Sequence, residues 1–190
     1  MIPFQDIASC DLCPLKGQNY ALSRTHRGEG KKVMFVGEAP GAEEAKQHLA
    51  FVGRSGKLLD KWIAYLDIDN YVITNIVRHR PPENRVPAMD EINACIPYLY
   101  EEIKNENPHY IIALGKTSAI ILTCYTLGSY ALVNYVYGKS VMGKEFFRKV
   151  PGSNSFFSVS VLYHPSYVLR SGIDMTQYLN KLKKMISEAN

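Results

Sequence analysis

Residues 33–59 constrain the fold of this chain more than any other stretch. The four apolar residues 33–36 predict a short buried strand, and the glycines and proline of residues 37–41 predict a tight loop after it. Glu38 lies in this loop, and Glu44 follows it closely. Ligands of open α/β sheets bind just outside the carboxyl ends of the strands. We therefore expect a functional site at this loop.

Apolar patterns further along the chain predict alternating strands and helices. Strands are expected at residues 71–77, 110–115 and 156–163, and helices at residues 55–66, from Pro87 onward, at 116–125 and at 174–187. This alternation predicts an α/β fold of three layers, α/β/α, in which helices cover both faces of a central four-stranded parallel sheet.

Length and composition limit the class of protein. The 190 residues suit a single domain over 1–190, with a cysteine-bearing lead-in at 1–30 and an irregular excursion at 126–155. A hydrophobic content of 46% and a charged content of 21% argue against disorder. Because no apolar run approaches a membrane span and the first residues lack signal-peptide order, we expect a cytoplasmic, intracellular protein without membrane contact. We also expect a monomer. The formal charge of +4 permits a polyanionic partner but does not indicate one.

A glycine or a polar residue lies at or after the end of each expected strand. Glu38 and Glu44 follow the first strand, Asn75 lies near the end of the second with His79 and Asn84 after it, Gly115 ends the third, and His164 follows the fourth. Each taken singly has a structural explanation, such as a turn, a solvated acid or a strand-end amide. The carboxyl ends of parallel strands meet at one edge of a sheet, so their convergence favours a shared site.

The four cysteines are more informative than the net charge. Cys10 and Cys13 form a Cys-x-x-Cys pair with no strand before it, which argues against a thioredoxin-like redox pair. Disulfides are not expected in a reducing compartment, so metal binding competes with free buried thiols as the explanation. Cys95 lies far downstream, and Cys124 falls in an apolar helix that favours a core position.

Four segments occur in a characteristic order together with these cysteines. They read GEAPGAEE at 37–44, FVGRSGKLL at 51–59, NIVRHRPPENR at 75–85 and HPSYVLR at 164–170. In this combination the chain, from Cys10 to about Arg170, resembles the family 4 uracil-DNA glycosylases, the iron–sulfur members of their superfamily. The resemblance implies an enzyme that hydrolyses the N-glycosidic bond of a flipped-out deoxyuridine, releases uracil and leaves an abasic site. The implied partner is uracil-containing DNA, single- or double-stranded.

The resemblance also implies how the uracil is held. Phe51 matches the aromatic residue on which the flipped base stacks, and Asn75 matches the amide that reads its edge. His164 matches a histidine near uracil O2, where a donor stabilises the leaving anion. Ala39 lies in the first motif, where the superfamily often has an aspartate and family 4 does not, and is implied to line the uracil pocket.

The water-activating group is implied by analogy alone. Glu44, coupled to Asn84, is expected to position the water, while Glu38 shapes the pocket. DNA contacts are implied at two places: Gly53, Ser55 and Lys57 at a helix start, and Val168, Leu169 and Arg170 just past His164. The family usually has leucine where Val168 stands, so we expect a shorter gap-filling side chain and weaker activity on duplex than on single strands.

In its expected metal ligands this chain departs from the family that it resembles. The usual ligands are four cysteines, and His79 stands in the place of one of them, beside Cys10, Cys13 and Cys95. Histidine ligates some iron–sulfur clusters, which favours a structural 4Fe–4S cluster with His79 as the fourth ligand. The same residues also form an ordinary zinc set, and a degenerate, empty site is the third alternative.

One function of another class also fits the sequence. A non-catalytic DNA-binding module, serving replication or repair as an accessory, would keep the fold without the activity. Such a module has no need for Glu38, Glu44, Asn75 and His164 together. Their joint presence therefore favours the enzyme.

Overall fold

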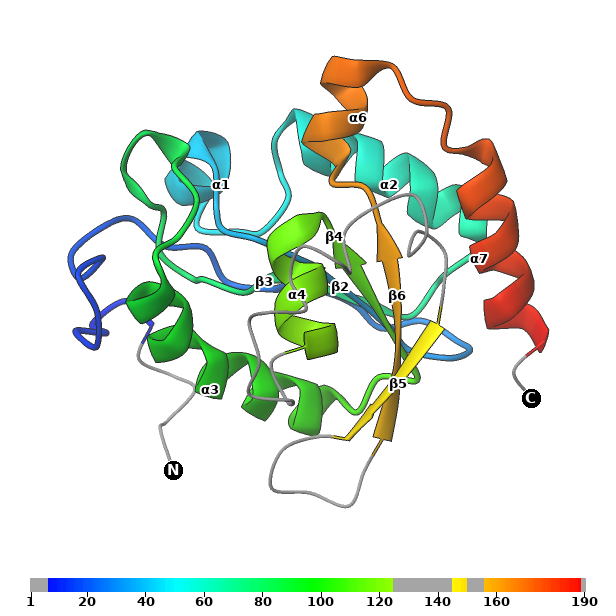
Figure 1. The fold of residues 1–190 in the computed structure, drawn as a ribbon, viewed down its shortest axis with the longest axis horizontal. Helices are drawn as coiled ribbons and strands as arrows, with labels where there is room; N and C mark the ends of the chain where they lie inside the picture. The colour runs from blue at the N-terminus through cyan, green and yellow to red at the C-terminus, as the bar shows by residue number, and fades with distance from the viewer. Residues whose placement is uncertain (1–6, 125–144, 150–155, 189–190) are drawn as a thin grey trace.

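The computed structural model describes residues 7–124, 145–149 and 156–188. Within them, six strands form one sheet in the order β1-β3-β2-β4-β6-β5 (Figure 1). They are β1 (Arg24–His26), β2 (Val33–Gly37), β3 (Tyr71–Asn75), β4 (Tyr110–Leu114), β5 (Glu145–Lys149) and β6 (Phe156–Leu162). The four central strands run parallel, while β1 and β5 pair antiparallel at the edges. The predicted fold class, with its four-stranded parallel centre, is confirmed.

The helices form the two outer layers. They are α1 (Ala42–Gln47), α2 (Arg54–Leu66), the 3-10 turn η1 (Pro82–Asn84), α3 (Met89–Glu106), α4 (Lys116–Cys124), α6 (Pro165–Ser171) and α7 (Thr176–Glu188). The connection from β2 to β3 runs in one direction along the sheet, and those from β3 to β4 and β4 to β6 run in the other. Because such crossovers are right-handed, α2 covers one face and α3 and α4 cover the other. Both α6 and α7 contact α2 (Figure 1).

The core explains why the central strands are continuously apolar. Val33, Met34 and Phe35 of β2 have no exposed surface, because both faces of the sheet are covered. Helix α2 buries Leu59 and Trp62 on the side that faces the sheet, as the spacing predicted.

Two edge strands and two short helices were not predicted. β1 has the polar sequence RTH, and α1 and α6 are too short for a helical period to be visible. β5 gives regular structure to residues 145–149 of the excursion that was expected to be irregular. The rest of that excursion, residues 126–144 and 150–155, lies outside the described residues.

The topology fixes where a site can form. The carboxyl ends of β2, β3, β4 and β6 lie at one edge of the sheet, at Gly37, Asn75, Leu114 and Leu162. The loops that leave this edge carry the polar residues singled out in the sequence. Among the helices that the structure describes, none has the length and apolar character required to cross a membrane.

Candidate active site

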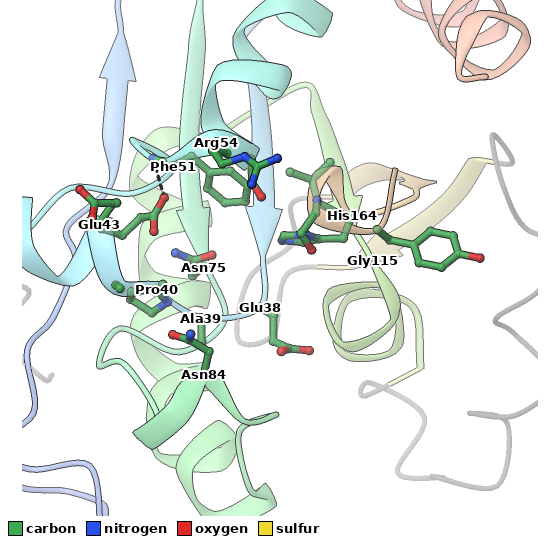
Figure 2. Close-up of a pocket in the computed structure, with 18 of the residues that line it drawn as sticks. Glu38, Ala39, Pro40, Glu43, Phe51, Arg54, Asn75, Asn84, Gly115 and His164 are labelled. Carbon is green, nitrogen blue, oxygen red and sulfur yellow. Dashed lines mark hydrogen bonds between the residues drawn. The ribbon is translucent and has the colours of Figure 1, made fainter. Parts of the chain in front are cut away.

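A cavity of about 610 Å³ opens at this edge of the sheet. Figure 2 shows Phe51, Asn75 and His164 facing it, with Ala39, Asn84 and Glu38 along one side. Of the residues expected to act on uracil or contact DNA, ten line the cavity: Glu38, Ala39, Glu44, Phe51, Gly53, Ser55, Asn75, Asn84, His164 and Arg170. Side chains from four segments far apart in the sequence thus share one hollow.

Gly37 brings the aromatic ring and the amide together. A β-carbon on Gly37 would lie 2.5 Å from Asn75 Oδ1 and 2.6 Å from Phe51 Cζ. Only a glycine therefore allows both side chains to pack against the end of β2. Phe51 is buried and has a left-handed backbone (φ 54°), a costly conformation for a non-glycine residue that is typical of functional sites.

Asn75 lines the cavity and holds a buried acceptor that no described residue bonds. The residue is 3% exposed, and its Oδ1 has no hydrogen-bond partner among the described residues. A buried acceptor without a partner costs about 1–3 kcal/mol, so such an atom in a cavity suits a ligand that brings a donor. The amide can also donate through Nδ2, so it matches a planar edge that carries a donor beside an acceptor.

His164 is held as a neutral hydrogen-bond donor. It caps α6, and its Nδ1 accepts hydrogen bonds from the Ser166 backbone N–H (3.1 Å) and hydroxyl (2.8 Å). The ring hydrogen is therefore on Nε2. The pKa of His164 is lowered to about 4, mainly by burial and in part by the charge of Arg170, while Glu44 opposes the shift. The ring lies 5.8 Å from that of Phe51, between centroids.

Gly115 makes room for this histidine. Its φ is +91°, which disfavours any other residue, and a β-carbon there would lie 2.9 Å from His164 Cβ. The loop after β4 thus packs directly under the imidazole.

The two glutamates are anchored differently. Glu44 Oε1 accepts a hydrogen bond of 2.9 Å from Gly53 N–H, which ties α1 to the start of α2. Its Oε2 is not needed for that bond. Glu38 accepts a hydrogen bond from the Thr117 hydroxyl, near the start of α4. Both carboxylates border the cavity, Glu44 bonded to the start of α2 and Glu38 bonded to α4.

Asn84 comes from the loop after β3. Its Oδ1 accepts a hydrogen bond from Arg80 Nε at 2.8 Å, which leaves the NH₂ group as its available donor. Arg85 binds Glu91 through two hydrogen bonds, of 2.8 and 2.5 Å, and this pins the loop to α3.

Not every expected DNA contact reaches the cavity. Lys57, Val168 and Leu169 are absent from its lining, and Val168 is 9% exposed and packs in the hydrophobic core. The lining also includes charged and aromatic residues that were not predicted as site residues: Glu43, Arg54, Arg85, Lys116 and Tyr167. Arg54 and Lys116 each begin a helix at the carboxyl edge, a position that the predicted helix starts could have pointed to.

The expected metal ligands lie apart from the cavity. The pKa of Cys95 is raised to about 11, mainly by burial and in part by the nearby Cys13 and Cys10, whose own thiols also influence each other. Each thiol is therefore within electrostatic reach of the others. The Arg78 backbone N–H also bonds to Cys95.

His79 is a buried histidine with one ring nitrogen bonded to the backbone. It is buried, burial lowers its pKa, and it hydrogen-bonds to the backbone of Ile7. Its Nε2 is buried and has no partner among the described residues. Metal-bound histidines commonly bond a backbone carbonyl through the other ring nitrogen, as this one does. In the described ranges, no three His, Cys, Asp or Glu side chains are grouped closely enough to hold one metal ion.

Comparison with known proteins agrees with this geometry. Residues 26–186 match the family model of the Uracil DNA glycosylase superfamily. The chain is 38% identical over 170 residues to the type-4 uracil-DNA glycosylase of Pyrobaculum aerophilum, covering 86% of this chain and 81% of that protein. It is 33% identical over 189 residues to the type-4 uracil-DNA glycosylase of Thermotoga maritima, covering 96% and 86% respectively.

The match is not limited to these two relatives. The type-4 uracil-DNA glycosylase of Archaeoglobus fulgidus is 30% identical over 184 residues, which cover 95% of this chain and 88% of that protein. The resemblance inferred from the motifs is thereby confirmed. The chain belongs to the uracil-DNA glycosylase superfamily and, within it, to the type-4 family.

Proposed function

We propose that this protein is a DNA-repair uracil-DNA glycosylase that acts inside the cell as a monomer. It hydrolyses the N-glycosidic bond of a deoxyuridine flipped out of single- or double-stranded DNA, releasing uracil and leaving an abasic site. The relatives named above are type-4 uracil-DNA glycosylases. The observation that carries the proposal is the buried Asn75 Oδ1 beside Phe51 at the cavity, an acceptor that none of the described residues bonds.

Asn75 explains the choice of base. Uracil N3–H can donate to the unpaired Oδ1 while O4 accepts from Nδ2. Cytosine presents an acceptor at N3 and a donor at N4, so it would set donor against donor and acceptor against acceptor. Phe51 supplies the surface on which the base stacks, and Ala39 lines the same hollow.

His164 would stabilise the leaving group. As the glycosidic bond breaks, negative charge develops on the base and positive charge on the sugar. The Nε2–H of a neutral imidazole, fixed by Ser166 on its other nitrogen, can donate to uracil O2. Because the ring is already oriented, this hydrogen bond needs no rearrangement when the charge appears.

Glu44 is the first candidate to position the water. Gly53 N–H holds one of its oxygens, which leaves Oε2 for a water that the NH₂ group of Asn84 can also contact. The carboxylate would also stabilise the oxocarbenium-like sugar, while Glu38 shapes the other wall. Glu44→Gln keeps the acceptor for Gly53 and removes the charge. A wild-type single-turnover rate in this variant would move the role to Glu38.

DNA backbone contacts are proposed for the start of α2 and for α6. Gly53 and Ser55 line the cavity at a helix N-terminus, where backbone N–H groups suit a phosphate. Arg54 faces the cavity from the same turn, whereas Lys57 lies further along the helix. Arg170 contributes a cation from α6.

A 4Fe–4S cluster is proposed on Cys10, Cys13, Cys95 and His79. Support comes from the raised pKa of Cys95, to which Cys13 and Cys10 contribute, and from the buried Nε2 of His79, which has no partner within the described ranges. When bound, the cluster would tie the lead-in to the loop after β3 and to α3, without a part in the hydrolysis.

Metal analysis of the anaerobically purified protein tests this ligand set. We expect iron and inorganic sulfide in equal amounts and a broad visible absorption band, which His79→Ala weakens and His79→Cys retains. Zinc in place of iron would favour a structural zinc site on the same residues. A metal-free, folded protein would mean an empty site.

One assay separates the enzyme from a DNA-binding module. The wild-type protein is incubated with an end-labelled oligonucleotide that carries one deoxyuridine, and with matched oligonucleotides that carry thymidine or deoxycytidine, before alkali treatment. We expect strand breaks at deoxyuridine and none at deoxycytidine. Binding to all three oligonucleotides without a strand break would leave only the non-catalytic module.

A further inference from the structure

The side chain that enters the DNA after base flipping must be exposed beside the cavity. The segment after His164 was expected to supply it through Val168. Val168 is 9% exposed, however, and belongs to the hydrophobic core. In this conformation its side chain has almost no surface for DNA.

The helical phase of α6 explains this burial. Ser166 and Arg170 are four residues apart and both line the cavity, so they mark the face of α6 that looks toward it. Val168 is two residues, or about 200°, further around the helix than Ser166 and faces the opposite side. Exposing it would require a rotation of α6, which the cap bond from Ser166 N–H to His164 Nδ1 and the bond from Gly172 N–H to Val168 O oppose.

Tyr167, unlike Val168, has an exposed side chain beside the cavity. It is 44% exposed and lines the cavity. Its ring lies 5.5 Å from that of Tyr163, which is itself buried and packed edge-on against Tyr178. Tyr167 is thus a protruding aromatic side chain with a rigid base behind it.

The position of Tyr167 also couples it to the chemistry. Its backbone N–H donates to the carbonyl of His164 at 2.9 Å, in the first turn of α6. A ring held at this position would enter the base stack at a fixed offset from the imidazole. An aromatic side chain stacked on a base contributes about 1–3 kcal/mol, whichever base it meets.

We infer that Tyr167, and not Val168, is the side chain that fills the gap left in the duplex by the flipped nucleotide. This inference rests on the proposed function. It assigns duplex DNA as a substrate and predicts that Tyr167 matters most there, because a single strand leaves no stacked gap to fill.

The test compares single-turnover rates on one uracil-containing sequence, as a single strand and as a duplex. We expect Tyr167→Ala to lower the ratio of duplex to single-strand rate by about 10- to 100-fold. Tyr167→Phe keeps the ring and should restore the ratio. As a second readout, the fluorescence of a 2-aminopurine next to the uracil should rise less when Tyr167→Ala binds than when the wild type binds, because the uracil is flipped less completely.

Tyr65→Ala is the matched control, since Tyr65 is also 44% exposed but lies on α2 away from the cavity lining. The inference is overturned if Val168→Ala or Leu169→Ala slows single-turnover uracil release on the duplex alone while Tyr167→Ala leaves both rates unchanged. It is also overturned if Tyr167→Ala lowers the single-turnover rate equally on the duplex and on the single strand. If the wild-type protein releases uracil from neither substrate, the proposed function itself fails and the inference falls with it.

Discussion

The carbonyl oxygen of Phe51 lies 1.8 Å from where a β-carbon on Gly56 would stand. The loop that carries the stacking ring therefore rests directly on the first turn of α2, with no room for a side chain between them. This contact, with the packing of the ring against Gly37, holds Phe51 in its left-handed conformation.

Replacing Gly56 should displace the ring. Gly56→Ala forces the Phe51 carbonyl to move, and overpacking of this kind costs about 1–3 kcal/mol. We expect a lower unfolding free energy in urea and slower uracil release. Lys61→Ala, at an exposed position on the same helix, is the control and should change neither quantity. An active, fully stable Gly56→Ala would contradict the packing described.

The pKa of His164 predicts how stability depends on pH. The pKa is about 4 in the folded protein against 6.5 when unperturbed, so the unfolded state binds the proton more tightly. The contribution of neutral His164 to the unfolding free energy is complete above about pH 6.5 and is lost as the pH falls toward 4. Urea unfolding at several pH values should show that the unfolding free energy falls more steeply with decreasing pH in the wild type than in His164→Gln.

The same pKa predicts that His164 is uncharged when it acts in catalysis. A neutral donor should keep the His164-dependent rate level between about pH 5 and 8, provided other groups do not titrate there. His164→Ala should lower the single-turnover rate about 100- to 1,000-fold across this range. A wild-type rate that climbs as the pH drops from 7 to 5, with no such climb in His164→Gln, would show that the imidazolium is required.

Glu83 stores strain in the loop that carries Asn84. Its backbone is left-handed (φ 56°, ψ 18°) and its side chain is exposed, so no packing explains a non-glycine residue there. Glu83→Gly should raise the unfolding free energy by about 1 kcal/mol. Glu83→Ala removes the charge but keeps a β-carbon in the left-handed conformation, so it should not raise the unfolding free energy. Equal gains in the two variants would point to charge instead.

A buried ion pair supports the end of β3 and α3. Arg78 and Glu102 are almost fully buried and bond at 2.5 Å, and Ser23 and Thr74 complete the network. Removing one partner leaves an unpaired buried charge, so Glu102→Ala should cost about 3–5 kcal/mol in urea unfolding. The neighbouring, more exposed Glu101→Ala should cost under about 0.5 kcal/mol. Similar costs for the two variants would show that the pair contributes little.

The sequence predicted the centre of the molecule better than its rim. Strands such as β2 and β4 are apolar throughout because both faces are covered, and this leaves a visible pattern. β1 and β5 take their stability from pairing with β3 and β6, which a local pattern does not reveal. Edge strands of this kind are recognised only when their partner is known.

The site shows the same division. Phe51, Asn75 and His164 were placed correctly at one cavity, because the motifs that carry them follow successive strands. The directions of Val168 and Lys57 depend on the phase of a helix within its first turns. That phase is set by the caps at His164 and Gly53, which the sequence alone does not fix.

The most direct measurement follows free uracil and stability together in Asn75→Leu. Leucine has nearly the shape of asparagine but brings no unpaired acceptor into the buried position. We predict that this variant releases uracil from a single-stranded oligonucleotide at least about 100-fold more slowly than the wild type, while unfolding at the same or higher urea concentration. Uracil release at the wild-type rate by Asn75→Leu would contradict the claim that this amide reads the base.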